Sequence, residues 1–395
     1  MWHVVSSWRM VEMKNRAGMM VQNLTGEMAY KSYKPVALSS YVPQNLSKDT
    51  FNLLTEANKK LAYLNGVSSQ IPDIDLFVSM YVRKEALLSS KIEGTQCTLD
   101  DIFDPSVDYN KNLEVSDVVN YVRAMEYGSN RMQTMPICSR LLKEIHTVLL
   151  ANVRGADKNP GEFRSSQNWI GPKGSTLWNA SYIPPNVTDM QEAMSDLEKY
   201  INGDNDLDYL IQAALVHYQF ETIHPFLDGN GRIGRLLIVL FLINKKLLFT
   251  PVLYLSYFLK QNRIEYYDRM TQVRRTGDYE QWIEFFLRAV KEAAEDSINA
   301  IEKLQALHKR DMAVISEHAT SRTLERLRTV FAYVERNPIL DVKNTAVKLG
   351  MAYNTVAVCV EKLCTWGILK QRGNNARMRI FAYEDYLAIL RADTE

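Results

Sequence analysis

Helical periodicity runs through most of the chain. Apolar residues recur three and four positions apart, which is the spacing that gathers them on one face of a helix. The pattern predicts helices over residues 74–92, 115–135, 137–152, 190–202, 207–223, 232–248, 263–275 and 279–308. The fold class that it predicts is mainly α.

One segment in the middle of the chain departs from this pattern. Residues 168–182 are rich in Gly, Ser, Asn and aromatic side chains, and they lead into Ile183-Pro184-Pro185. Such a composition favours turns and short extended stretches. We therefore expect a β-hairpin here, projecting from a helical body.

The periodic pattern restarts near residue 321, after a long charged helix that would serve as a connector. The expected order is helix, short helix, a turn at Gly350, helix, and two strands, over residues 323–337, 341–349, 352–366, 369–372 and 376–383. This order is typical of a winged helix-turn-helix. We accordingly divide the chain into an N-terminal helical region (1–110), a central unit (111–310) and a C-terminal unit (321–395).

Bulk composition changes this picture little. A chain of 395 residues exceeds the size of one ordinary core, and a net charge of +1 gives no global field that would argue for nucleic acid or a membrane. The longest apolar run, Leu236–Ile243, is far shorter than the roughly 20 residues of a membrane-spanning helix. The first residues, Met1 to about Gly18, lack the pattern of a signal peptide and are expected to form a loose extension.

The cysteines fit a reducing compartment. Their spacing suits neither a zinc site nor a redox pair, so we expect buried free thiols and a cytoplasmic protein; they are Cys97, Cys138, Cys359 and Cys364.

Phosphate-binding features gather between two predicted helices, in the stretch from His224 to Arg235. Gly229 and Gly231 allow backbone N–H groups to converge on an anion, and the helix that opens nearby adds the positive end of its dipole. Arg232 and Arg235 lie three positions apart and can hold phosphate oxygens with forked donors. The stretch therefore predicts a phosphate site.

The same stretch carries a base and a metal ligand. His224 is expected to titrate near neutrality, as removal of a proton from an incoming hydroxyl requires. Asp228 offers a hard oxygen ligand to Mg²⁺. The run Gly229–Gly234 also fits the G-x-G-x-x-G pattern of dinucleotide-binding proteins, but that pattern must follow a strand, and residues 207–223 have helical spacing.

Residues His224–Arg235 match, position by position, the HPFx(D/E)GNGRxxR signature of the Fic family, and the chain resembles that family here. The resemblance implies a helical bundle that transfers AMP from ATP to Tyr, Ser or Thr hydroxyls of target proteins, with ATP and Mg²⁺ as cofactors. It also implies a role for each residue of the motif. These roles are general base (His224), anchor of the loop (Phe226), Mg²⁺ ligand (Asp228), anion nest (Gly229, Asn230, Gly231) and phosphate clamps (Arg232, Arg235).

Two further segments resemble parts of the same family. Residues 161–171 and 180–185 resemble the region of its β-hairpin flap, whose edge would hold a target segment by strand addition; the residues expected to dock the target are Ile170, Gly171, Ser181 and Tyr182. A plain surface hairpin is the alternative. Tyr266 and Tyr267 resemble a pair near the adenine, whereas two tyrosines on a helix are as often core residues.

Ser89-Ser90-Lys91-Ile92-Glu93-Gly94 resembles the inhibitory helix of the family, (S/T)xxxE(G/N). Gly94 is expected to end the helix in the left-handed conformation, which leaves the carboxylate of Glu93 at the negative end of the helix dipole. The resemblance implies that Glu93 pairs with Arg235 and occupies space that the γ-phosphate of ATP needs. An exposed Glu beside a helix end is the alternative.

The C-terminal unit is only mildly basic. Residues 321–395 carry 12 Lys and Arg against 8 Asp and Glu, a net charge of +4. Lys370, Arg372, Arg377 and Arg379 lie on the expected wing, where they would contact DNA phosphates. A winged helix equally serves as a docking or dimerisation module, so a homodimer stays open alongside DNA and protein partners.

The sequence therefore predicts an autoinhibited, Mg²⁺-dependent protein adenylyltransferase with an appended winged helix. The main alternative is a DNA-binding regulator whose Fic-like part senses nucleotide, but a sensor has no need of His224. A third interpretation keeps the fold and removes AMP from proteins, with Glu93 orienting water.

Overall fold

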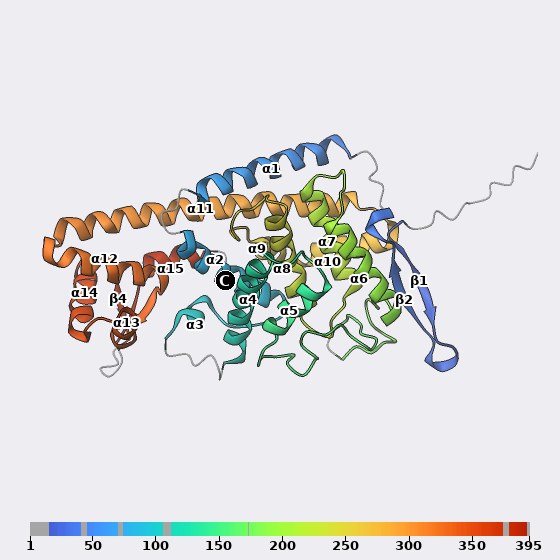
Figure 1. The fold of residues 1–395 in the computed structure, drawn as a ribbon, viewed down its shortest axis with the longest axis horizontal. Coiled ribbons are helices and arrows are strands. Elements are labelled where there is room, and N and C mark those ends of the chain that lie inside the picture. Colours follow the sequence, from blue (N-terminus) through green and yellow to red (C-terminus); the bar gives the residue numbers. More distant parts are fainter. Residues whose placement is uncertain are drawn as a thin grey trace, which may run out of the picture.

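The computed structural model describes residues 16–40, 46–69, 74–105, 112–172, 174–373 and 379–392. Within these ranges the chain is mainly helical, as the spacing of apolar residues predicts, with small antiparallel sheets (Figure 1). No helix of the described ranges combines the length and the apolar character needed to cross a bilayer. Residues 1–15 of the expected N-terminal extension lie outside the described residues.

Two helices form the centre of the fold. α7 (Tyr209–Ile223) and α8 (Asn230–Asn244) pack against each other, and the loop 224–229 joins them. Every residue of α7 from Leu210 onward is buried, so this helix needs partners on all sides. The helices that surround the pair are α4 (Leu113–Arg131), α5 (Ser139–Leu149), α6 (Val187–Asn202) and α11 (Glu280–His318).

A long helix covers one side of this bundle. α11 runs beside α1 (Lys48–Ser68) along the upper edge of Figure 1, and it continues past His308, where the periodic pattern predicts its end. α1 itself is absent from the predicted helices because many polar residues separate its apolar positions. Leu54, Leu61 and Leu64 nevertheless lie on one buried face.

The segment that carries the expected inhibitory motif is helical. α2 (Ile74–Ile92) packs against α4 and α9 (Leu255–Gln261), and the short α3 (Leu99–Phe103) follows it. α10 (Arg263–Thr276) lies between α9 and α11 in the chain and contacts both. These helices place the end of α2 close to the first turn of α8.

An N-terminal hairpin was not expected from the sequence. β1 (Gly18–Asn23) pairs antiparallel with β2 (Tyr30–Pro35), with Gly18 opposite Pro35, and short 3-10 turns lie at Gly26–Met28 and Leu38–Ser40. The backbone N–H of Tyr33 donates to the carbonyl of Ile183 at 3.0 Å. The hairpin therefore lies beside the predicted flap.

The flap is less regular than a two-stranded hairpin. Its two ends are joined by a single antiparallel bridge between Ile170 and Tyr182, with N–H···O distances of 2.8 and 3.0 Å. The described residues between them form turns, held in part by Asn179, whose Oδ1 accepts from the N–H of Thr176 at 2.6 Å. The abundant Gly, Ser and Asn favour such turns over a longer ladder.

The C-terminal residues adopt the winged helix-turn-helix order. Its elements are α12 (Ser321–Arg336), β3 (Ile339–Asp341), α13 (Val342–Leu349), α14 (Tyr353–Thr365), β4 (Lys370–Arg372), β5 (Ile380–Ala382) and α15 (Glu384–Arg391). The strands form one antiparallel sheet in the order β3–β5–β4. The first part of the predicted strand 376–383, residues 376–378, lies outside the described residues, and β5 covers Ile380–Ala382 of the rest. β3 and α15 are not predicted because each has few residues.

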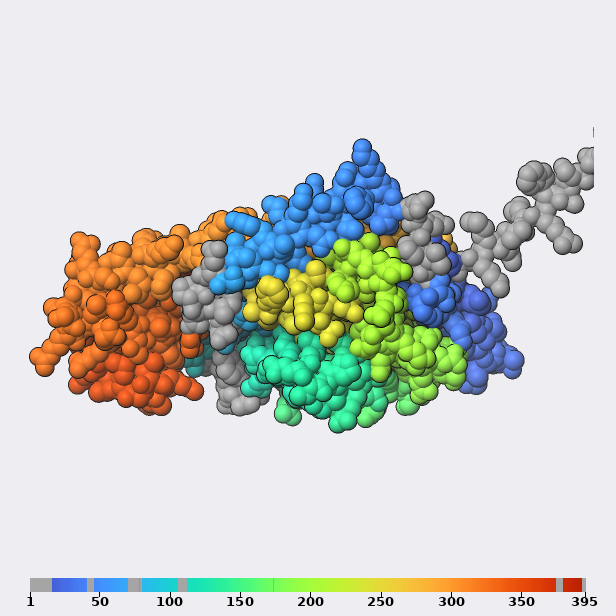
Figure 2. Space-filling view, turned by 45° about the horizontal axis from the view of Figure 1, so that its top comes forward, coloured from blue at the N-terminus to red at the C-terminus, as the bar shows by residue number. Residues whose placement is uncertain are grey.

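Charged residues join this C-terminal part to α3. The carboxylate of Asp100 accepts from Arg391 at 2.8 Å and lies 2.9 Å from Arg372, and both arginines also pair with Glu384. Figure 2 shows the C-terminal residues, in orange and red, at one end of the molecule. Arg372 is thus engaged within the chain, and Arg377 lies outside the described residues. The division into three units at 110 and 310–320 stays a prediction.

The four cysteines are free thiols, as expected. Cys97 and Cys359 are buried, whereas Cys138 and Cys364 are half-buried.

Candidate active site

The expected base lies at a strained turn. His224 ends α7 in the left-handed conformation, with φ 51° and ψ 61°, which is uncommon for a residue other than Gly. Gly229, with φ 77°, turns the chain again at the start of α8. Between them, the side chain of Asn230 accepts from the N–H of Phe226 at 2.9 Å and donates to its carbonyl at 2.8 Å. The side chain of the first residue of α8 therefore holds the loop closed.

Phe226 anchors this loop in the core. It is fully buried, and its ring stacks on His146 of α5, with the ring centroids 3.8 Å apart. Nδ1 of His146 accepts from the N–H of Gly161 at 2.9 Å, so Nε2 carries the proton and donates to the carbonyl of Asp228 at 3.0 Å. Burial lowers the pKa of His146 to about 4, which keeps it neutral.

Residues before the flap support the same loop. Arg164 is buried, and its Nε donates to the carbonyl of His224 at 3.0 Å. Asn168 donates to the carbonyls of His224 and Phe226 at 3.2 and 3.0 Å. The turn that carries His224 is thus held by side chains from a segment about 60 residues earlier in the chain.

The protonation of His224 differs from the expectation. Burial lowers the pKa of His224 to about 4, so the ring does not titrate near neutrality as the sequence suggests. The cause is the surrounding core of α7, which disfavours the charged imidazolium. A neutral imidazole accepts a proton at pH 7. The lowered pKa therefore changes the pH range over which His224 is neutral, but the ring can still act as a base at pH 7.

The end of α2 is capped in the way that the sequence predicts. Gly94 has φ 98°, and the N–H groups of Gly94 and Thr95 donate to the carbonyls of Lys91 and Ser90 at 3.1 Å. These two bonds form a Schellman motif, in which Glu93 is the C-cap residue that follows the last residue of α2, Ile92. The motif fixes the direction in which the carboxylate of Glu93 leaves the helix.

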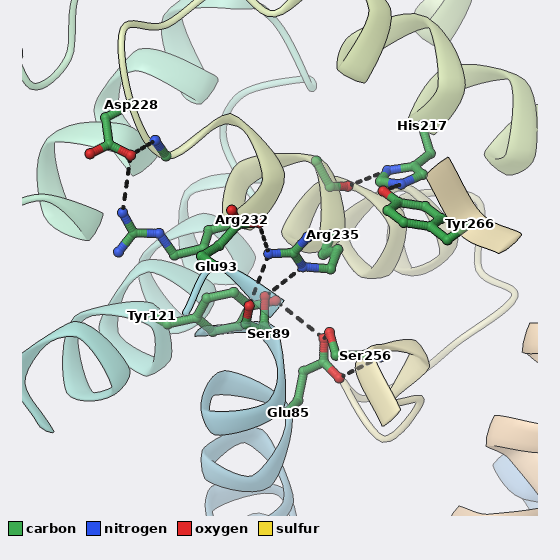
Figure 3. A network of polar contacts seen from close by, with 12 residues as sticks. Glu85, Ser89, Glu93, Tyr121, His217, Asp228, Arg232, Arg235, Ser256 and Tyr266 are labelled. Atoms are coloured by element: carbon green, nitrogen blue, oxygen red, sulfur yellow. Dashed lines mark hydrogen bonds and ion pairs between the residues drawn. The ribbon is translucent and has the colours of Figure 1, made fainter. Parts of the chain in front are cut away.

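The structure brings Glu93 and Arg235 together (Figure 3). Nη2 of Arg235 lies 2.7 Å from Oε1 of Glu93, and Arg235 also donates to the hydroxyl of Ser89 at 2.7 Å and to its carbonyl at 3.0 Å. Burial alone raises the pKa of Glu93, but the charge of Arg235 outweighs it and holds that pKa below its usual range. The pair is therefore ionised at neutral pH.

Gly231 makes room for this carboxylate. A Cβ atom at Gly231 would lie 2.3 Å from Oε1 of Glu93 and 3.0 Å from Nη1 of Arg235. The glycine thus allows an anion to approach the first turn of α8, where backbone N–H groups lack helical partners. In this structure the anion that occupies that space is the carboxylate of Glu93.

Arg232 pairs with a residue that the sequence does not single out. It is 1% exposed, and its Nη1 lies 3.2 Å from Oδ1 of Asp117 on α4, which is also buried. Oδ1 of Asp228 lies farther away, 3.7 Å from Nη2 of Arg232. Nε and Nη2 have no hydrogen-bond partner among the described residues. Arg232 thus keeps two donors for another group.

The carboxylate of Asp228 faces partly toward solvent. Its Oδ1 accepts from the N–H of Gly229 at 2.6 Å, and about a third of its side chain is exposed, 34%. Within the described ranges no group of three or more His, Cys, Asp and Glu side chains could hold a metal ion. A Mg²⁺ ion at Asp228 would therefore need phosphate oxygens and water as its other ligands, which is the usual arrangement for this ion.

The two tyrosines of α10 have different environments. Tyr266 is buried, and its hydroxyl lies 2.8 Å from Nε2 of His217, whose Nδ1 lies 3.0 Å from the carbonyl of Gly234. Since a carbonyl only accepts, Nδ1 donates and Nε2 accepts from Tyr266. Tyr266 therefore supports α8 from the core, whereas Tyr267 is 39% exposed.

The residues expected to dock the target also differ in exposure. Gly171 and Ser181 are exposed, and Ile170 is 36% exposed. Tyr182 is half-buried: its hydroxyl donates to the carbonyl of Thr222 at 2.7 Å, and the guanidinium of Arg274 lies 3.9 Å above its ring. Tyr182 thus fixes the flap to the end of α7, whereas Ile170, Gly171 and Ser181 are exposed.

Several residues that build the site carry no signal in the sequence. Asp117 and His146 lie on other segments, outside the motif, and only the fold brings them to it. Arg164 lies in the segment 161–171 that resembles the flap region, but its contact with the carbonyl of His224 is not predicted. Glu221 is a further one: burial raises its pKa to about 7, and its Oε1 lacks a hydrogen-bond partner among the described residues.

Comparison with known families agrees with this geometry. Residues 51–130 match the Fic/DOC family N-terminal model, and residues 136–242 match the Fic/DOC family model. The chain belongs to the Fic/DOC family.

The chain is similar to proteins named protein adenylyltransferase Fic. It is 31% identical over 180 residues to the one from Culex quinquefasciatus, which is 45% of this chain and 32% of that protein. It is 30% identical over 183 residues to the one from Drosophila melanogaster, which is 46% of this chain and 34% of that protein. The chain thus spans about a third of the length of these relatives.

A solved structure shares the fold. The crystal structure of a Fic family protein from Desulfovibrio desulfuricans superposes with a TM-score of 0.56 at 19% identity, over 87% of this chain and 98% of that one. This likeness extends the shared architecture beyond the two matched family regions.

Proposed function

We propose that this protein transfers AMP from ATP to Tyr, Ser or Thr hydroxyls of target proteins and releases pyrophosphate. The observation that carries the proposal is a neutral imidazole, His224, in the loop between α7 and α8, together with two buried arginines in the first two turns of α8. Family membership and relatives named as protein adenylyltransferases support it.

In the proposed reaction the imidazole of His224 takes the proton of the target hydroxyl. The hydroxyl oxygen then forms a bond to the α-phosphorus of ATP, and the bond from that phosphorus to the pyrophosphate oxygen breaks. The neutral state of His224 supports this role because only the neutral ring accepts a proton. Pyrophosphate leaves with the remaining negative charge.

The residues present fit a nucleotide triphosphate. Two unpartnered nitrogens on the buried Arg232 suit phosphate oxygens, and the space cleared by Gly231 leads to the free N–H groups of α8. Asp228 would hold Mg²⁺, which when bound neutralises phosphate charge. Tyr267, on α10, is the exposed member of the pair proposed for the adenine, and Ile170 offers the edge proposed for the target.

Glu93 is proposed to restrain this reaction. Its carboxylate holds Arg235, which is the second clamp for the phosphates. A phosphate and a carboxylate compete for the same guanidinium edge, so ATP would bind without its γ-phosphate in the productive position.

Incubation with ATP labelled at the α-phosphate, with and without cell extract, tests the proposal. We expect proteins to become labelled with ATP that carries the label at the α-phosphate. We expect no labelling with ATP that carries it at the γ-phosphate. Absence of label with both wild type and Glu93→Gly would reject the proposal. Transfer of the γ-label would indicate a kinase-like reaction instead.

The position of Glu93 also supports a second candidate, removal of AMP from modified proteins. A carboxylate that is 33% exposed beside the phosphate site can orient a water molecule for attack. An AMP-modified protein incubated with this enzyme distinguishes the two: release of AMP that depends on Glu93 would favour removal.

A further inference from the structure

Asp117 lies outside the motif and outside every role assigned so far, yet it is the nearest charged partner of Arg232 among the described residues. It comes from α4, in the region that matches the N-terminal family model. Both side chains of the pair are nearly inaccessible, 1% exposed for Arg232 and 4% for Asp117. A buried guanidinium requires a neutralising partner, because an unpaired charge in the interior is strongly unfavourable.

The contact between Asp117 and Arg232 leaves one edge of the guanidinium without a hydrogen-bond partner among the described residues. Asp117 contacts Nη1 only, at 3.2 Å. Nε and Nη2 form the opposite edge of the planar group, and these are the two nitrogens without a hydrogen-bond partner among the described residues. That edge is the one that binds two oxygens of a phosphate or carboxylate at once.

Buried donors without partners are rare in folded proteins, and those that occur call for an explanation such as a bound ion, a ligand or an ordered water molecule. The neighbouring groups point to the chemistry of this ligand. Asp228 lies 3.7 Å from Nη2, and the start of α8 lies on the same side, where backbone N–H groups favour an anion (Figure 3). A metal-bound phosphate would satisfy both the arginine and the carboxylate.

We propose that Asp117 is a positioning residue: it holds Arg232 by Nη1 so that Nε and Nη2 stay available to a phosphate of the nucleotide. This inference rests on the proposed function for the identity of the nucleotide. It assigns to α4 an indirect part in phosphate binding, since the orientation of Arg232 depends on a carboxylate from that helix. Burial raises the pKa of Asp117, and the charge of Arg232 opposes that rise.

The test compares ligands that contain phosphates with one that does not. Affinities for ATP, tripolyphosphate and adenosine are measured by calorimetry in the full chain carrying Glu93→Gly, alone and combined with Asp117→Asn. Asn keeps the shape of Asp but loses its charge, so its amide oxygen holds the Nη1 group of Arg232 more weakly. We expect about tenfold weaker binding of ATP and tripolyphosphate, as for loss of one hydrogen bond between charged groups. Adenosine binding should change by less than about twofold, within the error of such comparisons.

Two further variants separate positioning from folding. Asp117→Glu retains the charge and should restore part of the affinity for ATP. Glu126→Gln removes an exposed carboxylate from the same helix and should leave all three affinities unchanged. Thermal unfolding of each variant shows whether the fold is intact.

Equal weakening of ATP and adenosine would overturn the proposal, because it would indicate a general structural role. Unchanged affinity for ATP in Asp117→Asn would also overturn it, as would failure of the parent Glu93→Gly protein to bind ATP and tripolyphosphate. Failure of the proposed AMP transfer is a separate outcome. In that case no label is transferred, but Asp117→Asn still weakens the binding of ATP more than the binding of adenosine.

Discussion

Replacing Glu93 with Gly should remove the proposed inhibition and raise the rate of labelling. The size of this increase follows from the contact with Arg235 that is lost. Oε1 of Glu93 lies 2.7 Å from Nη2 of an arginine that is 2% exposed. A hydrogen bond between such charged groups contributes about 1.5–3 kcal/mol, and about 1.4 kcal/mol corresponds to a factor of ten. If ATP must displace the carboxylate before reaction, its loss should raise the rate of labelling about tenfold or more.

The assay is the initial rate of label transfer from α-labelled ATP, to the enzyme itself or to proteins of an extract. Glu93→Asp should fall between wild type and Glu93→Gly, because its shorter side chain reaches Arg235 less well. Gln133→Gly serves as the control, since it places a glycine at an exposed position in the turn after α4, outside the segment that caps α2. Its rate should equal that of wild type.

Two results would refute this reasoning. Labelling by Glu93→Gly at or below the wild-type rate would reject inhibition and favour a role of Glu93 in removing AMP. A gain that persists when Arg235→Ala is added to Glu93→Gly would show that release of the arginine is not the cause.

The remaining predictions concern the base, the metal and the C-terminal part. His224→Ala should lower the rate of label transfer at least about a hundredfold while ATP still binds. Because burial lowers the pKa of His224 to about 4, the neutral base is present throughout pH 5–8. A rate of label transfer that falls with acidification near pH 6.5 would contradict this lowered pKa. Asp228→Ala should abolish Mg²⁺-dependent labelling, and labelling with an unchanged dependence on Mg²⁺ would place the metal elsewhere. Residues 321–395 are expected to bind duplex DNA modestly, with an affinity that falls steeply with salt; no gel shift at about 50 mM salt would favour protein docking.

The sequence predicts the local features of this protein well because they depend on neighbouring residues. The α7–α8 loop follows from the motif between His224 and Arg235, and the end of α2 follows from Gly94. Helical spacing identifies most of the helices around them. In each case the determining residues lie within one or two turns of the feature.

Local patterns do not predict features that depend on distant segments; the contact between Glu93 and Arg235, 142 positions apart, is expected only through the family resemblance. Nothing near Asp117 indicates that it meets Arg232, since the two are 115 positions apart. The pKa of His224 depends on how completely α7 is covered, which only the packing determines. The hairpin β1–β2 was missed for a related reason: its strands are short, and its neighbour, Ile183, lies about 150 residues away.

Transfer of AMP to a hydroxyl with His224 as the base is the central step of the proposed function. Intact-mass and peptide mass spectrometry of Glu93→Gly, after incubation with ATP and Mg²⁺, measures this directly. We predict an added adenosine monophosphate on a Tyr, Ser or Thr, of the enzyme or of an added target, and none in the double variant Glu93→Gly, His224→Ala. An unmodified mass in both, or an equal adduct in both, would contradict the account.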